Sequence, residues 1–446
     1  MNSLSIIHAK WIIPVVPDKK IYENHALVFE QRGAQRAGQG KIIDILPIDE
    51  CEQKYPCQTI IKRMQHVLIP GLVNAHTHSP MNLLRGLADD LPLMEWLEKH
   101  IWPAEHKYVN EQFIEHGSRL AMAEMLRSGS TTFNDMYFFP NVTARIADQV
   151  GIRAVLGQII IDFPSVWAKD AQEYLHKGQQ LHKQYLKHPL ISTVLAPHAP
   201  YTVSDENLLK VKESADELNT SIHIHLHETE DEINGSIQQH QCRPIQRLHK
   251  LGLITPKLIA VHMTHLTEDD IELLLNQKPQ LVHCPESNMK LASGISPVHR
   301  LLKQGLNIAL GTDGAASNND LNMLGEMRSA SFLSKVSTSD ATALNAEQVL
   351  QMATINGARV LGLEDQIGSL EIGKDADICA IDMDNIECQP IYHPLSQLVY
   401  AAGRENVSDV WVKGKQLLDN KNLTTIDIQQ VKNDCQLWHN KINQFS

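Results

Sequence analysis

The chain has 446 residues, of which 43% are hydrophobic and 21% charged, and its formal net charge is −12. This is the composition of an ordinary globular protein. The acidic balance argues against non-specific binding to nucleic acid or to anionic membranes, because both require a basic surface. The length suits one large domain and a smaller one, and a small molecule is the expected partner.

Seven cysteines are spread along the chain without a Cys-x-x-Cys pair. This distribution is typical of reduced thiols in the cytosol and not of a disulfide framework or a thiolate metal site. No apolar stretch approaches the roughly 18 residues that a membrane span needs, and the amino terminus lacks the basic lead and cleavage site of a secretory signal. We therefore expect a cytoplasmic protein without a membrane partner.

The two ends of the chain are expected to be β-structured. Short apolar runs at residues 10–16, 26–29 and 41–46 are separated by polar turns, and similar runs return at 368–381 and 410–415. Residues 1–66 and 362–446 are therefore predicted to form one small β-sandwich domain, the second part of which carries a C-terminal helix.

The middle of the chain, residues 67–361, alternates apolar β-like runs with longer helical patterns. Such alternation indicates βαβ units and a parallel sheet. The eight predicted strands are residues 67–73, 131–134, 154–161, 191–196, 221–226, 258–261, 280–283 and 307–310. The predicted fold class is α/β, a (β/α)8 TIM-type barrel, whose chemistry belongs at the carboxyl ends of its strands.

The first barrel strand ends in two histidines, within PGLVNAHTH at residues 70–78. Residues two apart in a strand lie on one face, so His76 and His78 can reach one cation, and imidazole is a favoured ligand of zinc and related metals. Taken alone, the pair can equally be structural, because the chain contains 23 histidines.

Other ligand-type residues follow other predicted strands. The fifth strand runs through HIHLHE, residues 223–228, whose three histidines can either include a metal ligand or line one polar face. Asp313, in GTDG after the eighth strand, is a turn former if taken alone and a ligand beside the histidines. Glu228 can be a helix-start residue, and His262 ends its strand more directly than His265 does. His198 follows the fourth strand.

Together these segments resemble the amidohydrolase superfamily, and further motifs are similar to its 5′-methylthioadenosine/S-adenosylhomocysteine deaminases. The similarity extends from about residue 10 to residue 415. The motifs that carry it are PGLVNAHTH, HIHLHE, the strand end at His262, LGTDGAASNN, NLLRGLADDLPL (82–93), WPAE (102–105), APHAPY (196–201), SNMKLASG (287–294) and GKDAD (373–377).

The resemblance implies one divalent metal, zinc by preference, with Fe²⁺ or Mn²⁺ as alternatives. Its ligands would be His76, His78, His225 and Asp313. Three neutral imidazoles and one carboxylate leave such a cation with residual positive charge, so that a water it holds loses a proton near neutral pH.

The resemblance also implies hydrolytic deamination of an adenine nucleoside to its inosine analogue and ammonia. Asp313 would take a proton from the attacking water, and His262 would orient that water. Glu228 would act as general acid and base at the purine ring. Glu105 would hold the ribose hydroxyls, and His198 would contact the sugar or the ring.

The length of the substrate tail depends on arginine, which binds carboxylates as a bidentate pair. No arginine follows Arg153 near the end of the third strand, so methylthioadenosine, and then adenosine, rank above S-adenosylhomocysteine; Arg153 itself is kept among the candidate substrate-binding residues. An arginine in place of Gln158 is the first substitution that would test this ranking. The apolar candidates for the base and thioether pocket are Leu83, Leu84, Leu93, Met94, Trp96, Leu97 and Met136.

Two other readings stay open on the sequence. The same metal motifs serve guanine deaminases and triazine chlorohydrolases, and a barrel can bind metal without catalysis. Complete ligands together with Glu228 favour an enzyme. The resemblance further implies a homo-oligomer, either a dimer or a tetramer.

Overall fold

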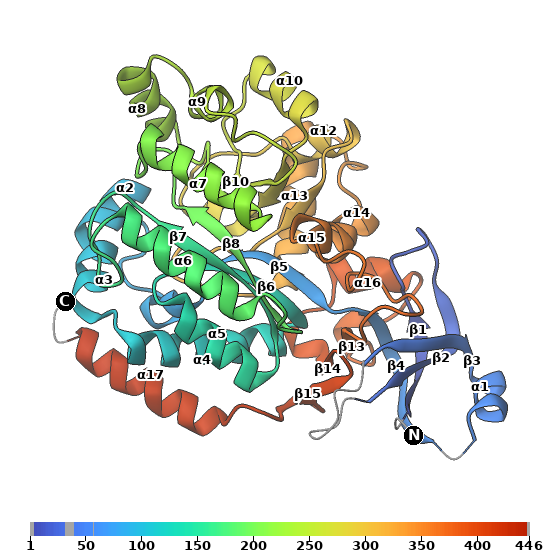
Figure 1. The fold of residues 1–446 in the computed structure, drawn as a ribbon. Coiled ribbons are helices and arrows are strands. Elements are labelled where there is room, and N and C mark those ends of the chain that lie inside the picture. The colour runs from blue at the N-terminus through green and yellow to red at the C-terminus, as the bar shows by residue number, and fades with distance from the viewer. Residues whose placement is uncertain (1–3, 32–39, 57, 444–446) are drawn as a thin grey trace.

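Two sheets organise the protein (Figure 1). The computed structural model describes residues 4–31, 40–56 and 58–443. Eight strands in chain order, β5 to β12, form a nearly closed parallel barrel, and a second eight-stranded sheet combines strands from both ends of the chain. The predicted α/β class, a (β/α)8 barrel with a separate β region from both chain ends, is confirmed.

Two hydrogen bonds, one to a side chain and one between backbone groups, close the barrel between its last and first strands. The backbone N–H of Thr312 donates to Asn74 Oδ1, and that of Asp313 donates to the carbonyl of His76, each at 3.0 Å. The barrel strands are β5 (Leu72–Thr77), β6 (Ser130–Tyr137), β7 (Arg153–Ile160), β8 (Ile191–Pro197), β9 (Ile222–Leu226), β10 (Leu258–His262), β11 (Gln280–His283) and β12 (Ile308–Leu310). The strands predicted from residue 131 onward overlap β6 to β12.

The strand predicted over residues 67–73 is divided between the two sheets at Gly71. β4 (Thr59–Pro70) belongs to the second sheet, and β5 begins at Leu72. A Cβ at position 71 would lie 2.1 Å from Thr131 Cγ2, so a residue with a side chain cannot take this place. Glycine therefore lets the chain pass directly from one sheet into the other.

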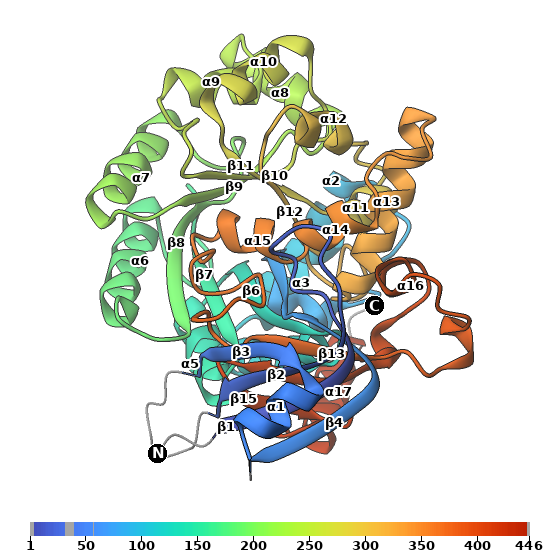
Figure 2. The same ribbon diagram turned by 90° about the vertical axis from the view of Figure 1, so that its right-hand side faces the viewer.

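Helices surround the barrel, and Figure 2 shows α6, α7, α9, α10 and α12 outside the strands. Side-chain caps set several of their starts; Asn110 accepts from the N–H of Phe113 at the start of α4, for example. These helices are α4 (Glu111–Arg127), α5 (Pro140–Val150), α6 (Ala171–Tyr185), α7 (Asp205–Leu218), α8 (Glu230–His240), α9 (Pro244–Lys250), α10 (Glu268–Gln277), α11 (Pro285–Lys290), α12 (Val298–Lys303), α13 (Met323–Thr338), α14 (Ala346–Met352) and α15 (Ile355–Val360). A further segment after β5 contains η1 (Ser79–Leu84), α2 (Leu93–Trp96), η2 (Leu97–Ile101) and α3 (Trp102–Tyr108).

The second sheet joins the two chain ends where β4 pairs antiparallel with β13. Its buried core includes Phe29 and Trp411, whose rings meet edge to face at 6.2 Å. The other elements are β1 (Leu4–Ile12), β2 (Tyr22–Glu30), β3 (Ile42–Pro47), α1 (Ile48–Lys54), β13 (Ile378–Asp382), η3 (Ile386–Cys388), α16 (Pro394–Tyr400), η4 (Arg404–Asn406), β14 (Val407–Val412), β15 (Lys415–Asp419), β16 (Asn422–Leu423) and the C-terminal helix α17 (Ile428–Ile442).

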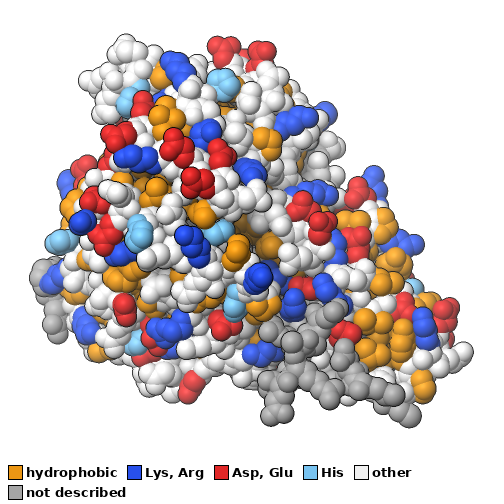
Figure 3. All heavy atoms as spheres, in the orientation of Figure 1, with side chains coloured by type: hydrophobic (Ala, Val, Ile, Leu, Met, Phe, Trp, Pro, Cys, Tyr) orange, Lys and Arg blue, Asp and Glu red, His pale blue; other side chains and the backbone are white. Residues whose placement is uncertain are grey.

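The distribution of surface charge and the state of the cysteines can be compared with what the composition suggests. On the face drawn in Figure 3, acidic and basic side chains are interspersed. None of the helices in the described part of the chain combines the length and the apolar character needed to cross a bilayer. The six described cysteines are all free, and Cys57 lies outside the described residues.

Candidate active site

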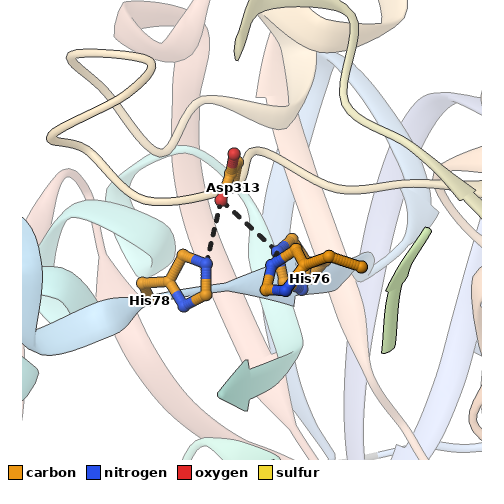
Figure 4. Close-up of side chains that lie close together, drawn as sticks. His76, His78 and Asp313 are labelled. Atoms are coloured by element: carbon orange, nitrogen blue, oxygen red, sulfur yellow. Dashed lines mark hydrogen bonds and ion pairs between the residues drawn. The ribbon is translucent and has the colours of Figure 1, made fainter. Parts of the chain in front are cut away.

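Four candidate metal ligands meet at the carboxyl ends of the barrel strands. His76 and His78 come from the end of β5, His225 from β9, and Asp313 from the loop after β12. Their ligand atoms all lie within 4.8 Å of one another. Asp313 Oδ1 is 3.3 Å from His76 Nε2 and 3.2 Å from His78 Nε2 (Figure 4). The structure thus brings together all four residues that the sequence singles out as ligands.

The tautomers of His78 and His225 are set by backbone carbonyls. His78 Nδ1 lies 2.6 Å from the carbonyl oxygen of Met136, and His225 Nδ1 lies 2.7 Å from that of His198. A carbonyl only accepts, so each Nδ1 carries the hydrogen, and in the neutral ring each Nε2 keeps its lone pair. The Nε2 atom of His78 faces Asp313 and that of His225 faces His76, so both are placed to bind a cation held by this group.

His76 is oriented by a buried relay that the sequence does not reveal. Its Nδ1 lies 3.0 Å from His223 Nε2, and His223 Nδ1 lies 2.6 Å from the side-chain amide of Asn134. Asn134 Nδ2 donates to His223 Nδ1, so the neutral His223 ring carries its hydrogen on Nε2 and donates to His76 Nδ1. His76 Nε2, 3.2 Å from His225 Nε2 and 3.3 Å from Asp313 Oδ1, then carries the hydrogen of its own ring. Binding of a divalent cation by the group would displace this proton.

Asp313 is held as a carboxylate. Burial raises its pKa, but the adjacent imidazole rings of His76 and His78 stabilise the ionised form and hold the pKa well below its usual range. Its Oδ2 accepts from the Ser287 hydroxyl (2.7 Å), and its Oδ1 from the N–H of Gly314 (2.8 Å). The residues present therefore fit a divalent metal, with three imidazole nitrogens and one carboxylate as donors.

Glu228 lies beside the ligand group on the loop that follows β9. Burial raises its pKa, although His262 acts in the opposite direction. Its backbone is fixed by Glu232 of α8, whose carboxylate accepts from the N–H groups of His227 (3.0 Å) and Glu228 (2.7 Å). A carboxyl group with a raised pKa in a fixed position suits proton transfer near neutral pH.

His262 and His265 have different surroundings. His262 Nδ1 is 2.9 Å from Asn288 Oδ1, and its Nε2 is 3.7 Å from Glu228 Oε2. The His265 ring instead donates to the carbonyl of Ser293 at 2.5 Å. The histidines of HIHLHE also have different partners. His225 belongs to the ligand group, whereas His227 bonds to backbone groups of residues 245 and 265.

A cavity of about 500 Å³ lies over this group. On its far wall Glu105 accepts a hydrogen bond from the Tyr137 hydroxyl at 2.5 Å. Of the proposed apolar pocket residues, Leu93, Trp96, Leu97 and Met136 line this cavity, whereas Leu84 is buried in the core and Met94 lines a neighbouring cavity.

Several cavity residues were absent from the sequence-based site. Tyr137 is the last residue of β6, so its position at a strand end was an available signal. Val166 lies in the loop after β7, where no periodic pattern marks a side chain that faces a cavity.

His198 lies at the cavity as a neutral imidazole. Burial lowers its pKa to about 3. Its Nδ1 is 3.2 Å from Thr202 Oγ1, whose own hydrogen goes to the carbonyl of Ala199 at 3.0 Å. His198 Nδ1 is then the donor, and its Nε2 remains free to accept a hydrogen bond from a bound molecule.

The candidate assignment of Arg153 to substrate binding is wrong. Arg153 begins β7, at the end of the barrel opposite to the ligand group. Its buried guanidinium contacts Asp375 (2.9 Å) and Asp377 (3.4 Å), which precede β13, and it does not line the cavity. The predicted strand 154–161 already puts Arg153 at its amino end, where in the structure it joins the barrel to the second sheet.

Replacing Arg153 by Met is expected to lower the free energy of unfolding by about 3 kcal/mol, because buried Asp377 loses its ion-pair partner, whereas Asp375 keeps Lys41 and Lys413. KM for any substrate should stay unchanged. Denaturant titration and steady-state kinetics measure the two effects. Arg145→Met, at an arginine whose side chain is 46% exposed, is the control and should change stability by less than about 1 kcal/mol. A raised KM in Arg153→Met with intact stability would restore Arg153 to the substrate site.

The barrel and its ligand group define a class of metal-dependent hydrolases. Residues 67–417 match the amidohydrolase family, and the chain belongs to that family. It is 46% identical over 436 residues to a 5-methylthioadenosine/S-adenosylhomocysteine deaminase of Teredinibacter turnerae, an alignment that covers 98% of this chain and 97% of the relative. A protein of the same name from Saccharophagus degradans is 47% identical over 437 residues. The alignment covers 98% of this chain and 96% of that protein.

A solved structure agrees with these relatives. An adenosine deaminase from Xanthomonas campestris, solved with bound zinc, superposes with a TM-score of 0.96 at 46% identity, covering 99% of this chain and 98% of that one. Family, relatives and ligand group together support a metal-dependent hydrolase that acts on carbon–nitrogen bonds.

Proposed function

We propose that this protein hydrolytically deaminates an adenine nucleoside, 5′-methylthioadenosine by preference, to the inosine analogue and ammonia. The observation that carries the proposal is the placement of Glu228 and His262 directly beside the His76, His78, His225 and Asp313 group, at the base of a largely apolar cavity. One Zn²⁺ per chain is the proposed cofactor, and Fe²⁺ or Mn²⁺ would satisfy the same donors.

The reaction divides among three residues. A bound divalent ion supplies Lewis-acid activation of the attacking water. Asp313, ionised and adjacent to the ion's place, accepts a proton from that water. Glu228, whose pKa burial raises, donates its proton to N1 of the purine ring. Its carboxylate then takes the remaining proton of the added hydroxyl group and delivers it to the departing amino group, and the proton held by Asp313 restores Glu228. His262, whose Nδ1 is held by Asn288, directs its Nε2 toward Glu228 and orients the attacking water.

Glu105 is the proposed clamp for the two ribose hydroxyls. Its carboxylate is on the cavity wall, and the Tyr137 hydroxyl holds one of its oxygens at 2.5 Å. The other oxygen is free to accept from a ribose hydroxyl, and a carboxylate accepts such bonds more strongly than a neutral group does. Guanine and triazines carry no ribose, so this residue separates a nucleoside deaminase from the rival activities of the family.

The Glu105 clamp predicts a pH dependence. Burial raises the pKa of Glu105 to about 7, and the Tyr137 hydrogen bond only partly opposes this shift. A raised carboxyl pKa means that the accepting, ionised form is present above pH 7 and is lost below it. kcat/KM for a nucleoside should therefore fall as pH drops through about 7, with the change mainly in KM.

Glu105→Gln should remove that limb of the pH profile and raise KM about tenfold at pH 8. Steady-state kinetics between pH 5.5 and 9 measure both effects. A variant that keeps the wild-type pH profile would show that another group titrates in this range and that Glu105 does not bind the ribose.

The cavity favours an uncharged substrate tail. Among the described residues that line it, none is Lys or Arg. Phe163 and Val166 cover its outer part, and Asp162 turns away, because its carboxylate accepts from the N–H of Ser204 and the amide of Asn207. A methylthio group can pack against such a wall, whereas the homocysteine carboxylate would enter it without a counter-charge. This contrast supports ranking methylthioadenosine above adenosine, and both above S-adenosylhomocysteine.

Gln158 is the wrong place to introduce an arginine. Its side chain packs under Gly178 of α6, outside the barrel, and does not line the cavity. Val166 does line it and is 38% exposed, so an arginine there can adopt a solvated position at the cavity mouth. Val166→Arg should raise kcat/KM for S-adenosylhomocysteine relative to methylthioadenosine about tenfold.

Leu209→Arg adds the same charge on α7, away from the cavity, and is the control for long-range electrostatics. It should leave the ratio of the two kcat/KM values unchanged. Equal gains in both variants would mean that net charge, and not a local ion pair, limits the longer substrate.

The overall proposal is tested with the purified protein and a substrate panel. Near-ultraviolet absorbance follows methylthioadenosine, adenosine, S-adenosylhomocysteine and guanine in separate reactions, and metal content is determined on the same sample. Conversion of the adenine ring to hypoxanthine, fastest with methylthioadenosine, is expected. Reaction of guanine or of triazines alone would assign another family activity, and a metal-loaded protein inert toward all of them would be a non-catalytic barrel.

The proposal also includes an oligomeric state and a cellular location for the enzyme. A homo-oligomer, dimer or tetramer, is expected, and sedimentation or light scattering at several concentrations would detect it. The six free cysteines support a cytoplasmic location, since a reducing compartment keeps them unpaired.

A further inference from the structure

A second cavity, of about 200 Å³, adjoins the first on the side of Glu228. The two cavities share three lining residues, namely Leu93, Tyr201 and Glu228. Behind them the side cavity reaches the first turns of α8 and the start of α9. Its remaining lining residues are Met94, Pro200, Thr229, Asp231, Glu232, Gly235, Ser236, Gln239, His240, Pro244 and Arg247.

Tyr201 and Leu93 form the wall between the cavities, and the Tyr201 side of this wall is rigid. Tyr201 belongs to the loop between β8 and α7, which also carries His198. Buried Arg247 donates to the carbonyls of Pro200 (2.5 Å) and Val203 (2.9 Å) and pairs with Asp205 at 2.6 Å. With the backbone fixed on both sides of Tyr201, its ring cannot move aside by a shift of the loop.

The position of this wall relative to a bound purine follows from the proposed function, on which this step rests. C6 lies at the ligand group, where water attacks it, and Glu228 protonates N1. In the purine ring C2 is the other neighbour of N1, on the side away from C6. A substituent on C2 therefore points past Glu228, toward Tyr201, Leu93 and the side cavity.

We propose that Tyr201, together with Leu93, determines specificity at purine C2: the wall admits a hydrogen there and excludes an amino group, for which the side cavity behind it would otherwise be a binding site. The side cavity suits an amino group in particular. Its lining includes the carboxylate of Asp231 and the neutral acceptors of Ser236 and Gln239, whereas both oxygens of Glu232 already accept from the N–H groups of His227 and Glu228. An amino group donates two hydrogen bonds, whereas a methyl group of equal size donates none.

The pKa of the Tyr201 hydroxyl agrees with a position between the two cavities. Tyr201 is 42% exposed as a whole, but local burial of its hydroxyl, followed by the charges of Glu228 and Glu232, raises the pKa of that hydroxyl well above the usual range. The hydroxyl end of the ring thus lies near the two carboxyl groups that flank the boundary between the cavities. The ring edge packs near His198, with ring centroids 6.1 Å apart.

The test compares 5′-methylthioadenosine with its 2-amino and 2-methyl derivatives. Wild type should disfavour both derivatives in kcat/KM. Tyr201→Ala should reduce the discrimination against the 2-amino compound about tenfold, a typical value for creating or removing space for one small group in a pocket. The gain for the 2-methyl compound should be smaller. Tyr201→Phe keeps the ring and should keep the discrimination, and Leu93→Ala opens the same wall from the other side.

Gly235 supplies the matched control. It lines the side cavity from α8, and a Cβ built on it has nothing within 4 Å. Leucine there should fill the cavity and improve the helix. Gly235→Leu alone should leave methylthioadenosine turnover unchanged, and Tyr201→Ala/Gly235→Leu should regain the discrimination that Tyr201→Ala loses.

The outcomes separate this inference from the proposed function. If wild type does not deaminate methylthioadenosine, the proposed function fails. If wild type deaminates it but accepts the 2-amino derivative equally well, or if neither Tyr201→Ala nor Leu93→Ala changes the ratio, the wall does not set specificity at C2. Calorimetric binding of the 2-amino product, measured without turnover, should show the same order among the variants.

Discussion

Glu228→Gln is expected to lower kcat for methylthioadenosine about 10²–10⁴-fold, the usual loss when a general acid and base is removed. The amide keeps the size of the side chain but cannot deliver a proton to N1 or to the leaving amino group. Metal content and product affinity should remain close to wild type, because Glu228 is not among the ligand residues. Stopped or continuous absorbance assays, with metal analysis and calorimetry on the same preparation, separate these quantities.

Glu230→Gln is the matched control for that variant. Glu230 lies two residues further along, is exposed and begins α8, so it tests the loss of a carboxylate without the loss of the proton relay. Its turnover should equal that of wild type. Near-normal turnover in Glu228→Gln would assign proton transfer to another residue and leave Glu228 a binding role at most.

Removal of the metal is expected to abolish turnover and to lower thermal stability. A chelator-treated sample should regain activity with about one equivalent of Zn²⁺, and a metal at 1,000 times its Kd adds about 4 kcal/mol of stability. Asp313→Ala should reproduce the loss without rescue, because it removes one donor and leaves the three histidine nitrogens without their carboxylate. An activity assay measures turnover, metal analysis with calorimetric titration measures zinc binding, and a thermal melt measures stability.

Asp269→Ala, at an exposed carboxylate in the first turn of α10, should retain metal and activity. Full activity of a sample shown to be metal-free would contradict the proposed role of the ligand group. Full metal occupancy in Asp313→Ala with lost activity would instead limit Asp313 to proton transfer.

The ligand group was accessible from the sequence because its members end apolar strands, and parallel strands in a barrel bring their carboxyl ends together. That reasoning placed His76, His78, His225 and Asp313 correctly with respect to one another. It was not applied to Arg153, which precedes the predicted strand 154–161 and so lies at the amino end of β7, away from the ligand group.

Other parts of the site depend on packing between segments far apart in the chain. The contact of His223 with Asn134 joins β9 to β6, and Tyr201 meets Leu93 only because the segment after β5 lies over the loop after β8. The side chain of Gln158 faces a helix and not the cavity, since alternate residues of a barrel strand point in opposite directions. Local patterns carry no signal for such pairings.

The direct passage from β4 to β5 through Gly71 has a consequence for synthesis on the ribosome. β4 pairs on one side with β1, which precedes it, and on the other with β13, which is made about 300 residues later. At roughly 5–20 residues per second this interval lasts tens of seconds. Throughout it, the apolar run Val67, Leu68 and Ile69 forms an unprotected sheet edge beside the strand that carries the first two ligands, and such edges promote aggregation. A chain that stops before β13 would keep that edge permanently, so we expect the solubility of the nascent chain, as well as its stability, to depend on β13 of the second sheet.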